Sequence, residues 1–415
     1  MLLHKAHVYR LYPTPEQAAV LGQWVGAVRA TYNVALEQRR AFYRPGRSFT
    51  FAGQCREVTA LRAEFDWLRD VPVHPLQQAV KDLQRAYERW WSALKAWAAL
   101  PPGEKAKTPR PGPPSSRKRG FNDSMRFPDP ATFAFRRISR RVGEAKLPKL
   151  GWVRFRWDKA VPGEVRNVTV KRHAGQWFVA AQYEREAAAS TPSDLPAVGI
   201  DRGVAVFAAL SDGTLIEPAN HGKKALKALA RAQHRLARKK RGSANRRKQA
   251  RRITRLHMRV ANARKDTLHK LSTAIANSHG AVVLEKLEVP NMVRSAAGTV
   301  AEPGRNVRAK AGLNRAILDQ GWGMFRAMLG WKLAERGGRL VEVPAQNTSQ
   351  ECSTCGVMDA ASRDRQWFRC VGCGYEAHAD TNAAKNIKRR LDTPLLPVEG
   401  CRQAPREAGT GRKAA

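Results

Sequence analysis

The chain has 415 residues, enough for about two to four domains at the usual size of roughly 100–200 residues each. It carries 75 Lys and Arg against 35 Asp and Glu, so its net charge is +40 and a polyanion is its expected partner. Nucleic acid is favoured over a membrane, because no apolar run approaches the ~20 residues of a membrane-spanning helix.

The N-terminal residues predict one β-strand and no export signal. Residues 5–12 alternate polar and apolar side chains and stop at Pro13, as a strand would. The first ten residues lack the apolar core of a signal peptide. Cys55 and Cys401 are too isolated in the sequence to pair, so we expect a reducing cytoplasm.

Residues 14–100 predict two long helices whose apolar side chains recur every three or four positions. The two runs are Val20, Trp24, Val28, Tyr32 and Leu36, then Leu76, Val80, Leu83, Tyr87, Trp91 and Leu94. We interpret both runs as faces packed in a core, the usual role of such a period. Basic side chains are expected to be exposed beside them, as phosphate ligands or as an ordinary solvated surface. They are Arg39, Arg40, Lys81, Arg85 and Arg89.

The composition and then the period change after residue 100. Residues 101–120 are rich in Pro, Gly, Lys and Arg, which predicts a linker or exposed loop. Residues 147–157 and 168–183 alternate with a period of two and share a hairpin turn at Ala174-Gly175. With the first strand they predict a small β-barrel interrupted by the helices. Interleaved basic and aromatic side chains on these strands suit nucleic acid, but equally an ordinary half-buried sheet.

A Ser/Thr/Pro-rich stretch at 188–196 marks the next boundary. Residues 197–217 predict three short strands with tight turns at Arg202-Gly203 and Asp212-Gly213. Asp201 ends the first of these strands among apolar neighbours. Because an unpaired buried charge is costly, Asp201 either caps the turn or holds a metal ion.

Residues 222–270 are the most basic part of the chain, with 19 Lys or Arg and a single acid, Asp266. Their helical period breaks at Gly242-Ser243, which predicts two basic helices. This excess of positive charge is larger than solubility requires and indicates a nearby phosphate backbone.

Further strands and a helix follow. A buried strand at 281–287 contains Glu285, an acid in an otherwise apolar run. A polar loop at 294–312 precedes a helix that ends at Gly337-Gly338, and residues 339–344 form one more strand. The predicted inner face of that helix is Leu318, Trp322, Phe325, Leu329 and Leu333.

Cysteines near the C-terminus form two C-x-x-C pairs, each followed by a glycine that permits a tight turn. They are Cys352, Cys355, Cys370 and Cys373. This spacing favours one tetrahedral Zn²⁺ over two disulfides. Four thiolates leave no open coordination position, so we expect the zinc to be structural.

Three acids are expected to converge at one end of a mixed sheet: Asp201, Glu285 and Asp380, which begins the last predicted helix. Each alone has an ordinary interpretation, as a turn cap, an edge residue or a helix N-cap. Together they would repel one another, so the set predicts divalent cations between them. Two Mg²⁺ ions about 3.5–4 Å apart would stabilise the attacking water and the leaving 3′-oxygen of a phosphodiester.

Several segments resemble a known family. They are residues 199–203 (GIDRG), 284–287 (LEKL), 346–356 (QNTSQECSTCG) and 380–387 (DTNAAKNI). They look like the transposon-encoded TnpB nucleases, compact relatives of the type V CRISPR effectors, and the resemblance covers nearly the whole chain. It implies a multidomain α+β fold. A RuvC-like (RNase H-type) α/β nuclease domain would contain an inserted zinc ribbon, and an N-terminal wedge-like β-barrel would be interrupted by a helical recognition domain.

Composition and resemblance together divide the chain into domains. The barrel takes residues 1–13 and 121–187, the recognition domain 14–100, the linker 101–120, the nuclease domain 195–345 and 377–392, the zinc ribbon 346–376 and a disordered tail 393–415. The resemblance implies catalysis by Asp201, Glu285 and Asp380 with Mg²⁺ or Mn²⁺. It also implies a guide RNA from the transposon end, and cleavage of double-stranded DNA next to a short target-adjacent motif. The expected location is the prokaryotic cytoplasm, in association with the nucleoid.

One residue departs from the family pattern. Family members often carry Arg just before the last acid, where this chain has Ala379; if that Arg positions the phosphate, cleavage is expected to be slower here. Two other functions stay open. An RNA-guided repressor should have lost an acid, and none is missing, whereas a strand-joining transposase would use the same two-metal chemistry.

Overall fold

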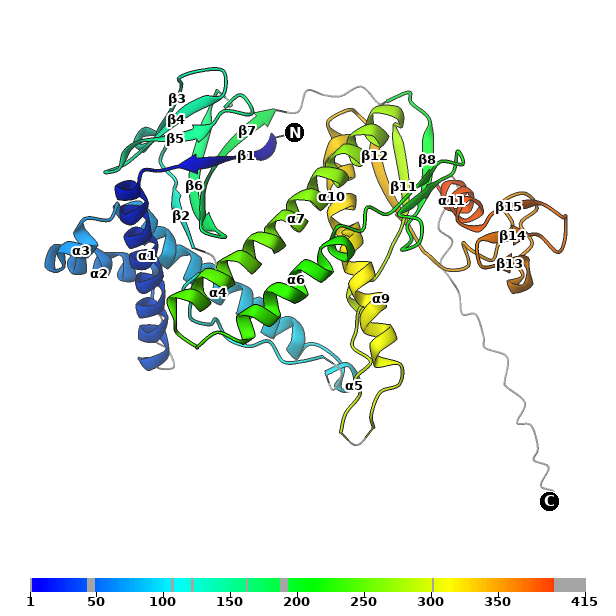
Figure 1. Ribbon diagram of the computed structural model, residues 1–415, viewed down its shortest axis with the longest axis horizontal. Coiled ribbons are helices and arrows are strands. Elements are labelled where there is room, and N and C mark those ends of the chain that lie inside the picture. The colour runs from blue at the N-terminus through cyan, green and yellow to red at the C-terminus, as the bar shows by residue number, and fades with distance from the viewer. Residues whose placement is uncertain are drawn as a thin grey trace. The chain divides into compact units, whose positions relative to one another are not determined.

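The computed structural model describes residues 2–42, 49–105, 108–120, 123–161, 163–186, 193–300 and 302–391. The chain divides into two compact units, residues 1–188 and 189–415 (Figure 1). Each unit has its own hydrophobic core. Within the described ranges no helix is both long and apolar enough to cross a bilayer. Cys401 and the tail predicted at 393–415 lie outside these ranges.

The first unit contains a seven-stranded antiparallel sheet of order β2-β6-β7-β1-β5-β4-β3. Its strands are β1 (Leu2–Tyr12), β2 (Ser124–Phe127), β3 (Ala134–Arg137), β4 (Val142–Leu147), β5 (Gly151–Arg156), β6 (Val165–His173) and β7 (Gln176–Glu186). The hairpin turn predicted between the last two is present, with φ of 52° at Ala174 and 77° at Gly175. Within the described residues β2 and β3 form two edges, so the predicted barrel is open in its hydrogen bonding.

The helices of the first unit are α1 (Pro15–Ala41), α2 (Phe51–Glu64), α3 (Asp66–Arg69), α4 (Val73–Ala98) and α5 (Pro102–Lys105). α1 begins at a capping box, in which the Thr14 side chain accepts from the Gln17 backbone and the Gln17 side chain accepts in return. The predicted apolar faces of α1 and α4 meet in the core, where Leu36 and Leu83 are fully buried.

Two predictions for these helices were wrong. Arg39, expected on the surface, is only 7% exposed, because its guanidinium donates to Gln54 and Gln84 at 2.9 and 2.8 Å and lies over the Tyr87 ring. Trp91, expected in the core, is 49% exposed, since Tyr87 is the last buried residue of α4 and Trp90, rather than Trp91, packs against the core beyond it. The prediction of a loop without regular structure at 101–120 is wrong in part, because Pro102–Lys105 form the short helix α5. Residues 108–120 have no regular secondary structure, but they pack against α1 and α4.

The second unit contains a five-stranded mixed sheet of order β10-β9-β8-β11-β12. Its strands are β8 (Ala197–Asp201), β9 (Ala208–Leu210), β10 (Leu215–Ile216), β11 (Ala281–Glu285) and β12 (Arg339–Val343), of which β8, β11 and β12 run parallel. The predicted turn at Asp212-Gly213 is present. The tight turn predicted at Arg202-Gly203 is wrong: residues 202–207 form a longer connection, because the Arg202 side chain turns inward and donates to the Glu285 carbonyl.

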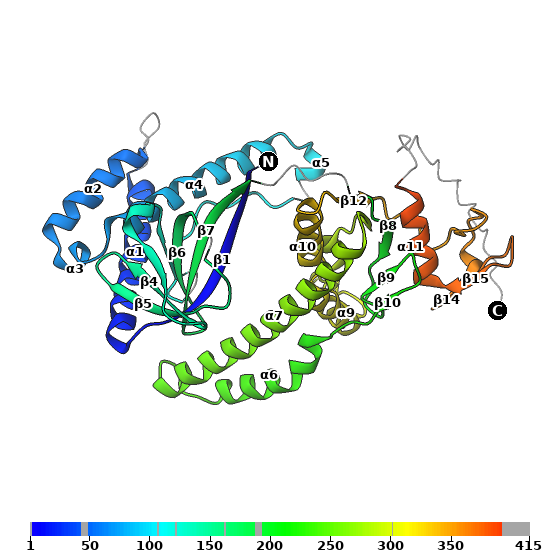
Figure 2. The ribbon, with the colours of Figure 1, turned by 90° about the horizontal axis from the view of Figure 1, so that it is seen from above.

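The helices of the second unit are α6 (His221–Ala237), α7 (Ala244–Ser278), α8 (Val289–Met292), α9 (Val307–Gln320), α10 (Trp322–Ala334) and α11 (Ala379–Arg389). The two predicted basic helices are confirmed as α6 and α7, which pack side by side (Figures 1 and 2). The single helix predicted through Leu318 is wrong. Gly321 has φ of 70° and separates α9 from α10, α9 begins at Val307 inside the predicted loop, and Leu318 is 56% exposed.

A small three-stranded sheet precedes α11. Its strands are β13 (Arg363–Asp364), β14 (Trp367–Arg369) and β15 (Glu376–His378). Two short 3-10 helices, Pro130–Thr132 and Ala360–Ser362, complete the described elements. Phe368 of β14 is buried beside two of the four cysteines, so this sheet and the cysteine loops share one small core.

Candidate functional site

Asp201 and Glu285 lie at the carboxyl ends of two neighbouring parallel strands. Ile200 of β8 pairs with Leu284 of β11, so the next residue of each strand is one of the two acids. Side chains at equivalent positions of paired parallel strands point to the same face of a sheet. The strand register therefore sets the two carboxylates side by side.

Helix α11 carries Asp380, its second residue, and packs directly against β8. The close approach depends on Gly199, the middle residue of β8. A Cβ atom there would overlap the carbonyl oxygen of Ala384 and the amide nitrogen of Lys388, both in α11. The glycine of the GIDRG motif thus lets the helix reach the strand that ends in Asp201.

The three acids interact electrostatically. Burial first, and then the negative charges of Glu285 and Asp380, raise the pKa of Asp201 to about 7. Burial also raises the pKa of Glu285. Burial and neighbouring carboxylates both oppose ionisation, so Asp201 lies where a nearby positive charge would be favourable.

Two hydrogen bonds hold Glu285, one to its carboxylate and one to its backbone carbonyl. Thr348 Oγ1 donates to Glu285 Oε1 at 2.6 Å, and both side chains are buried. The guanidinium of Arg202 donates to the Glu285 backbone carbonyl and is itself buried. Thr348 belongs to the QNTSQE segment, so this motif contacts the acid directly.

Arg363 supplies a cation beside the third acid. Its Nη2 lies 3.3 Å from Asp380 Oδ1. Ala379, where family members carry Arg, is fully buried and its amide donates to the Gln366 carbonyl at 2.8 Å. Sequence reasoning missed Arg363, because nothing in the pattern distinguishes it from the other basic residues of the chain.

Buried asparagines of α11 bind the segment that precedes the cysteines. Asn382 Nδ2 donates to the Glu351 carbonyl at 2.8 Å, and its Oδ1 accepts from the Ser353 amide at 2.9 Å. Asn386 Nδ2 donates to the carbonyls of Thr348 and Glu351 at 3.0 and 2.6 Å. The first cysteine loop, α11 and the carboxylates are therefore one connected structure.

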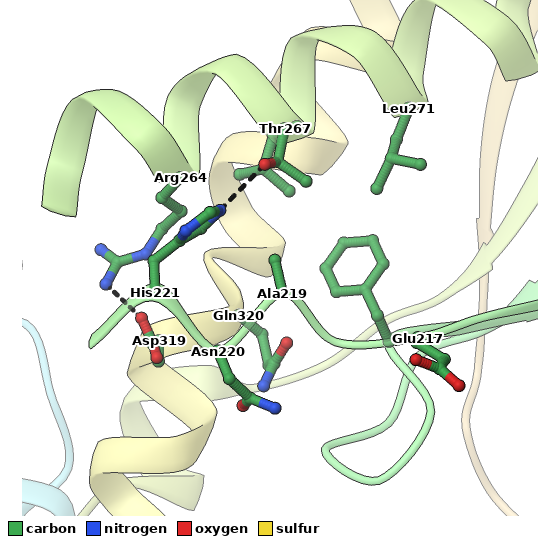
Figure 3. Close-up of a pocket in the computed structure, with 11 residues that line it drawn as sticks. Glu217, Ala219, Asn220, His221, Arg264, Thr267, Leu271, Asp319 and Gln320 are labelled. Atoms are coloured by element: carbon green, nitrogen blue, oxygen red, sulfur yellow. Dashed lines mark hydrogen bonds and ion pairs between the residues drawn. The ribbon is translucent and has the colours of Figure 1, made fainter. Parts of the chain in front are cut away.

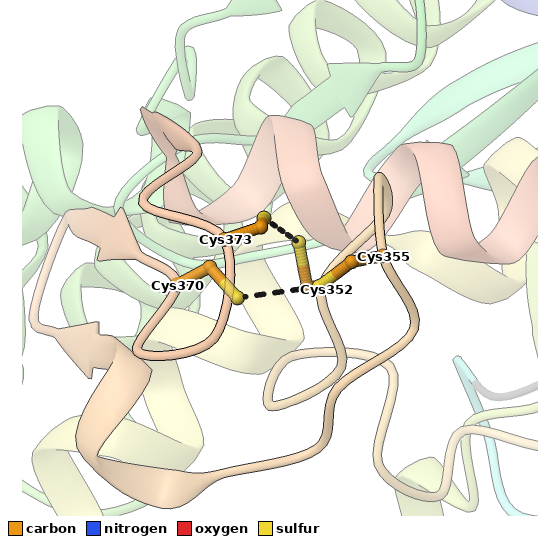
Figure 4. Close-up of side chains that lie close together, drawn as sticks. All are labelled: Cys352, Cys355, Cys370 and Cys373. Carbon is orange, nitrogen blue, oxygen red and sulfur yellow. Dashed lines mark hydrogen bonds between the residues drawn. The ribbon is translucent and has the colours of Figure 1, made fainter.

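The four cysteines form a compact cluster (Figure 4). Their Sγ atoms all lie within 4.8 Å of one another, and the Cys352–Cys373 and Cys355–Cys370 pairs are 3.8 and 3.5 Å apart. A disulfide would bring the sulfurs to about 2.05 Å, so the alternative of two disulfides is wrong. Tetrahedral Zn–S bonds of about 2.3 Å place sulfurs about 3.8 Å apart, so the cluster has the geometry of a structural zinc site.

Among the described residues, the cysteine cluster forms a tight group of ligand atoms, and the three carboxylates do not form one with each other. The structure thus brings Asp201, Glu285 and Asp380 to the same end of the sheet without gathering them around a single point.

A separate polar hollow of about 20 Å³ lies at the start of α6 (Figure 3). Asp319 accepts from the backbone amides of Gly222 and Lys223 and from Arg264 Nη2 at 2.6 Å. Buried as it is, its pKa is nevertheless lowered by these hydrogen bonds. With Asp319 hydrogen-bonded and room for a single water, the hollow lies where α6, α7 and α9 meet.

The fold and the site define a class: a multidomain α+β protein with three carboxylates at the end of a mixed sheet and a four-cysteine cluster beside them. Family models match three parts of the chain. Residues 180–296 match the IS605 OrfB model described as "Probable transposase", 322–387 a "Cas12f1-like, TNB domain", and 1–48 a "Helix-turn-helix domain". In the described part of that last range the structure has a strand and one long helix.

The relatives cover almost the full chain. "Putative RNA-guided DNA endonuclease InsQ" of Escherichia coli (strain K12) is 41% identical over 387 residues, spanning 92% of this chain and 91% of the relative. A "Putative RNA-guided DNA endonuclease" of Streptomyces pristinaespiralis is 33% identical over 418 residues, spanning 98% and 94%. The chain belongs to the TnpB family of IS605-type transposon proteins.

A solved structure shares the fold at low identity. The "mini-RNA-guided endonuclease CRISPR-Cas_phi3" superposes with a TM-score of 0.51 at 11% identity, covering 96% of this chain and 93% of that one. The expected relationship to the type V effectors is therefore found in the fold as well as in the sequence.

Proposed function

We propose that this protein is an RNA-guided DNA endonuclease that hydrolyses phosphodiesters with two divalent cations. The observation that carries the proposal is the electrostatic coupling of Asp201 to Glu285 and Asp380. Carboxylate oxygens are the ligands that Mg²⁺ and Mn²⁺ prefer. The raised pKa of Asp201 indicates that the site favours added positive charge, so the residues fit such ions.

The three acids would hold the ions, and their neighbours would orient them. When bound, two Mg²⁺ or Mn²⁺ ions would stabilise the attacking water and the leaving 3′-oxygen. In a site with two ions, each carboxylate can bind either ion, so the three need not form one tight group to hold the pair. Thr348 restricts the rotation of the Glu285 carboxylate. Arg363, which lies beside Asp380, would contact a phosphate there and take the role left open by Ala379.

The cysteine cluster would hold structural Zn²⁺. Its coordination would fix the loop that carries Glu351 and Ser353, and these residues accept and donate the hydrogen bonds of Asn382 in α11. Zinc would thus support the position of Asp380 without touching the substrate.

The partners follow from the family and the charge. We assign a guide RNA from the transposon end and a double-stranded DNA target cut next to a short target-adjacent motif, in the prokaryotic cytoplasm at the nucleoid. Base pairing would supply the sequence specificity, and the protein would supply positive charge and a complementary shape. The nuclease domain would be RuvC-like, residues 195–345 and 377–392 with the ribbon 346–376 inserted. The wedge-like barrel (1–13 and 121–187) and recognition domain (14–100) would hold the guide–target duplex.

Cleavage by the purified ribonucleoprotein tests the proposal. With Mg²⁺ and a DNA target matched to the co-purified RNA, the wild type should cut, whereas Asp201→Ala should bind and cut about 100-fold more slowly or not at all. Asp212→Ala, which alters an exposed turn acid of the same unit, should cut normally. Wild-type speed in Asp201→Ala would reject the site. Binding without cutting by both proteins would support the repressor, and joined strands the transposase.

A further inference from the structure

The strap segment, residues 108–120, is held on the first unit at intervals of three residues. Four of its carbonyl oxygens each accept one hydrogen bond from a side chain of α4 or α1. They are those of Thr108, Pro111, Pro114 and Arg117; their donors, in that order, are Trp97, Trp90, Arg40 and Asn33, at 2.8, 3.0, 2.7 and 3.1 Å. The segment therefore runs back along α4 toward its N-terminal half and onto α1.

The burial of the strap segment follows the same period. Residues 111, 114 and 117 are half-buried, and the residues between them are exposed. A polyproline II helix has three residues per turn and rises about 3.1 Å per residue, so one of its three faces would dock in this way. Trp90 and Trp97 are two turns apart on α4, about 10 Å, close to the about 9 Å spanned by three such residues. Three residues of the strap therefore span about the same distance as the two α4 tryptophans that bind it.

Arg117 closes the docked face. Its amide donates to Asn33 Oδ1 at 2.8 Å, its Nη2 donates to Asp82 Oδ2 at 2.8 Å, and its guanidinium lies 4.0 Å from the Tyr32 ring centroid. These contacts neutralise Arg117 and turn it inward. The neighbouring residues of the strap, Ser115, Ser116 and Lys118, are exposed.

A hollow of about 750 Å³ opens between the strap, α1 and α4. Arg85 and Arg89 line it from α4 and Lys118 from the strap, and among the described residues none of the three has an ion-pair partner. Asp82, the acid among the described lining residues, is already paired with Arg117. The hollow therefore offers uncompensated positive charge and the hydroxyls of Ser115 and Ser116.

We propose that this hollow binds the phosphodiester backbone of a nucleic acid, and that docking of the strap segment builds it. Guanidinium, ammonium and hydroxyl groups are the usual phosphate contacts, and they read no base sequence. The volume exceeds by far the about 30 Å³ of a single water, so an extended polyanion fits it better than one small ion. The inference rests on nucleic acid being the partner, as proposed above, and not on the cutting chemistry.

Salt-dependent binding tests the site in two arms. The first measures the affinity of RNA-stripped protein for its own co-purified RNA, and the second that of the ribonucleoprotein for a matched DNA duplex, both in the Asp201→Ala background. In Arg85→Gln/Arg89→Gln we expect about tenfold or greater loss of affinity near 0.15 M salt. The slope of log affinity against log salt should fall by about 1.4–1.8, the value for two phosphate contacts. The arm that changes identifies the bound backbone as guide RNA or target DNA.

A matched control separates the site from net charge. Lys81→Gln/Lys95→Gln removes two exposed charges from the same helix outside the hollow, and it should leave the slope within error of the parent. An unchanged slope in both arms for the arginine variant, or an equal loss in the lysine variant, would overturn the proposal. The measured quantity is binding affinity, so the result can be interpreted even if the protein does not cut DNA.

The contribution of the strap is tested without changing charge. Trp90→Phe/Trp97→Phe removes the two indole donors and keeps aromatic rings in place. We expect a several-fold loss of affinity in the same arm that responds to the arginine variant. The melting temperature of the first unit should not change. Full affinity in this variant would show that the docked strap does not build the site. Arg85 and Arg89 are exposed, so their variant decides the binding site even if the tryptophan variant folds poorly.

Discussion

Thr348 shows how a neutral side chain can set the position of a charged one. Its hydroxyl donates to one oxygen of Glu285 inside the protein, where that carboxylate has few other ways to be solvated. Residues that orient a ligand in this way commonly change metal affinity or activity by about 10- to 100-fold when they are replaced.

Thr348→Val keeps the shape of the side chain and removes the donor. We expect it to raise the Mg²⁺ concentration for half-maximal cleavage by about tenfold, because the Glu285 carboxylate loses its fixed orientation. Calorimetric titration of Mn²⁺ should show the same loss without any cleavage. Thr348→Ser, which keeps the hydroxyl, is the matched control and should behave like the wild type. A valine variant with wild-type metal dependence would contradict the role of Thr348.

The raised pKa of Asp201 predicts pH-dependent cation binding. With its pKa at about 7, Asp201 is largely protonated at pH 6 and largely ionised at pH 8, and a divalent cation must displace that proton. The apparent affinity for Mg²⁺ or Mn²⁺ should therefore weaken about tenfold from pH 8 to pH 6. Calorimetry in two buffers of different ionisation enthalpy would count the released proton. Asp201→Asn cannot titrate, so most of this pH dependence should vanish in it.

The same shift lowers stability in the metal-free protein. The folded-state pKa of Asp201 lies above the ordinary value of 3.8, so the folded state binds the extra proton between these two values. Stability from this group is therefore present at low pH and is lost as the pH rises toward 7. Added divalent cations should restore it, because they bind the folded state.

At the scale of elements, the contact between β8 and α11 decides whether the third acid reaches the other two. Gly199 has no Cβ, and the backbone of α11 occupies the space that a Cβ would need. Every side chain larger than hydrogen would have to move the helix that carries Asp380.

Gly199→Ala should therefore lose both stability and cleavage. Overpacking of this kind costs about 1–3 kcal/mol of unfolding free energy, and the displaced helix should reduce cleavage by more than the stability loss explains. Denaturant unfolding and cleavage at saturating Mg²⁺ measure the two effects. Gly323→Ala in α10 is the control, since nothing lies within 4 Å of the added methyl group, and it should be neutral or stabilising. Wild-type cleavage in Gly199→Ala would show that Asp380 does not depend on this contact.

Periodicity predicted most of the elements, because a helix or strand must bury one face. It placed Leu36 and Leu83 in a core and located the break between the two basic helices at Gly242-Ser243. It could not find the break at Gly321, since the apolar spacing runs on through it. It also could not find the burial of Arg39, which depends on glutamine partners from two other helices.

The candidate site was less accessible from sequence. The three acids stood out because a charge interrupts an apolar run or opens a helix, and the cysteines because of their spacing. Thr348 and Arg363 did not, because their meaning lies in contacts across 63 and 17 positions of the chain. The period of three in the strap was likewise masked by its proline-rich composition, which predicted only an exposed loop.

At the scale of the whole molecule, the cysteine cluster belongs to the same unit as the carboxylates and is joined to them through α11. Loss of the metal from the cluster would release the loop that holds Asn382 and Asn386. Such a loss should therefore displace α11 and with it Asp380, although we assign the thiols no direct part in cleavage.

Removal of zinc should therefore abolish cleavage even with Mg²⁺ in excess. A thiol-reactive mercurial together with a chelator should release about one zinc per chain, lower the melting temperature of the second unit, and stop cleavage; added Zn²⁺ after reduction should restore both. Cys352→Ser should mimic the effect, whereas Cys55→Ser, outside the cluster, should not. Full cleavage by protein shown to lack zinc would contradict the support that we assign to the cluster.

The position of α11 so late in the polypeptide has a consequence during synthesis. A nascent chain on the ribosome has both basic helices and two of the three acids long before Asp380 is translated. Premature termination or a frameshift between α10 and α11 would thus yield a product that keeps both basic helices and lacks the residue that completes the carboxylate set. On the function proposed above, such a product would bind nucleic acid without cutting it and would compete with the full-length protein.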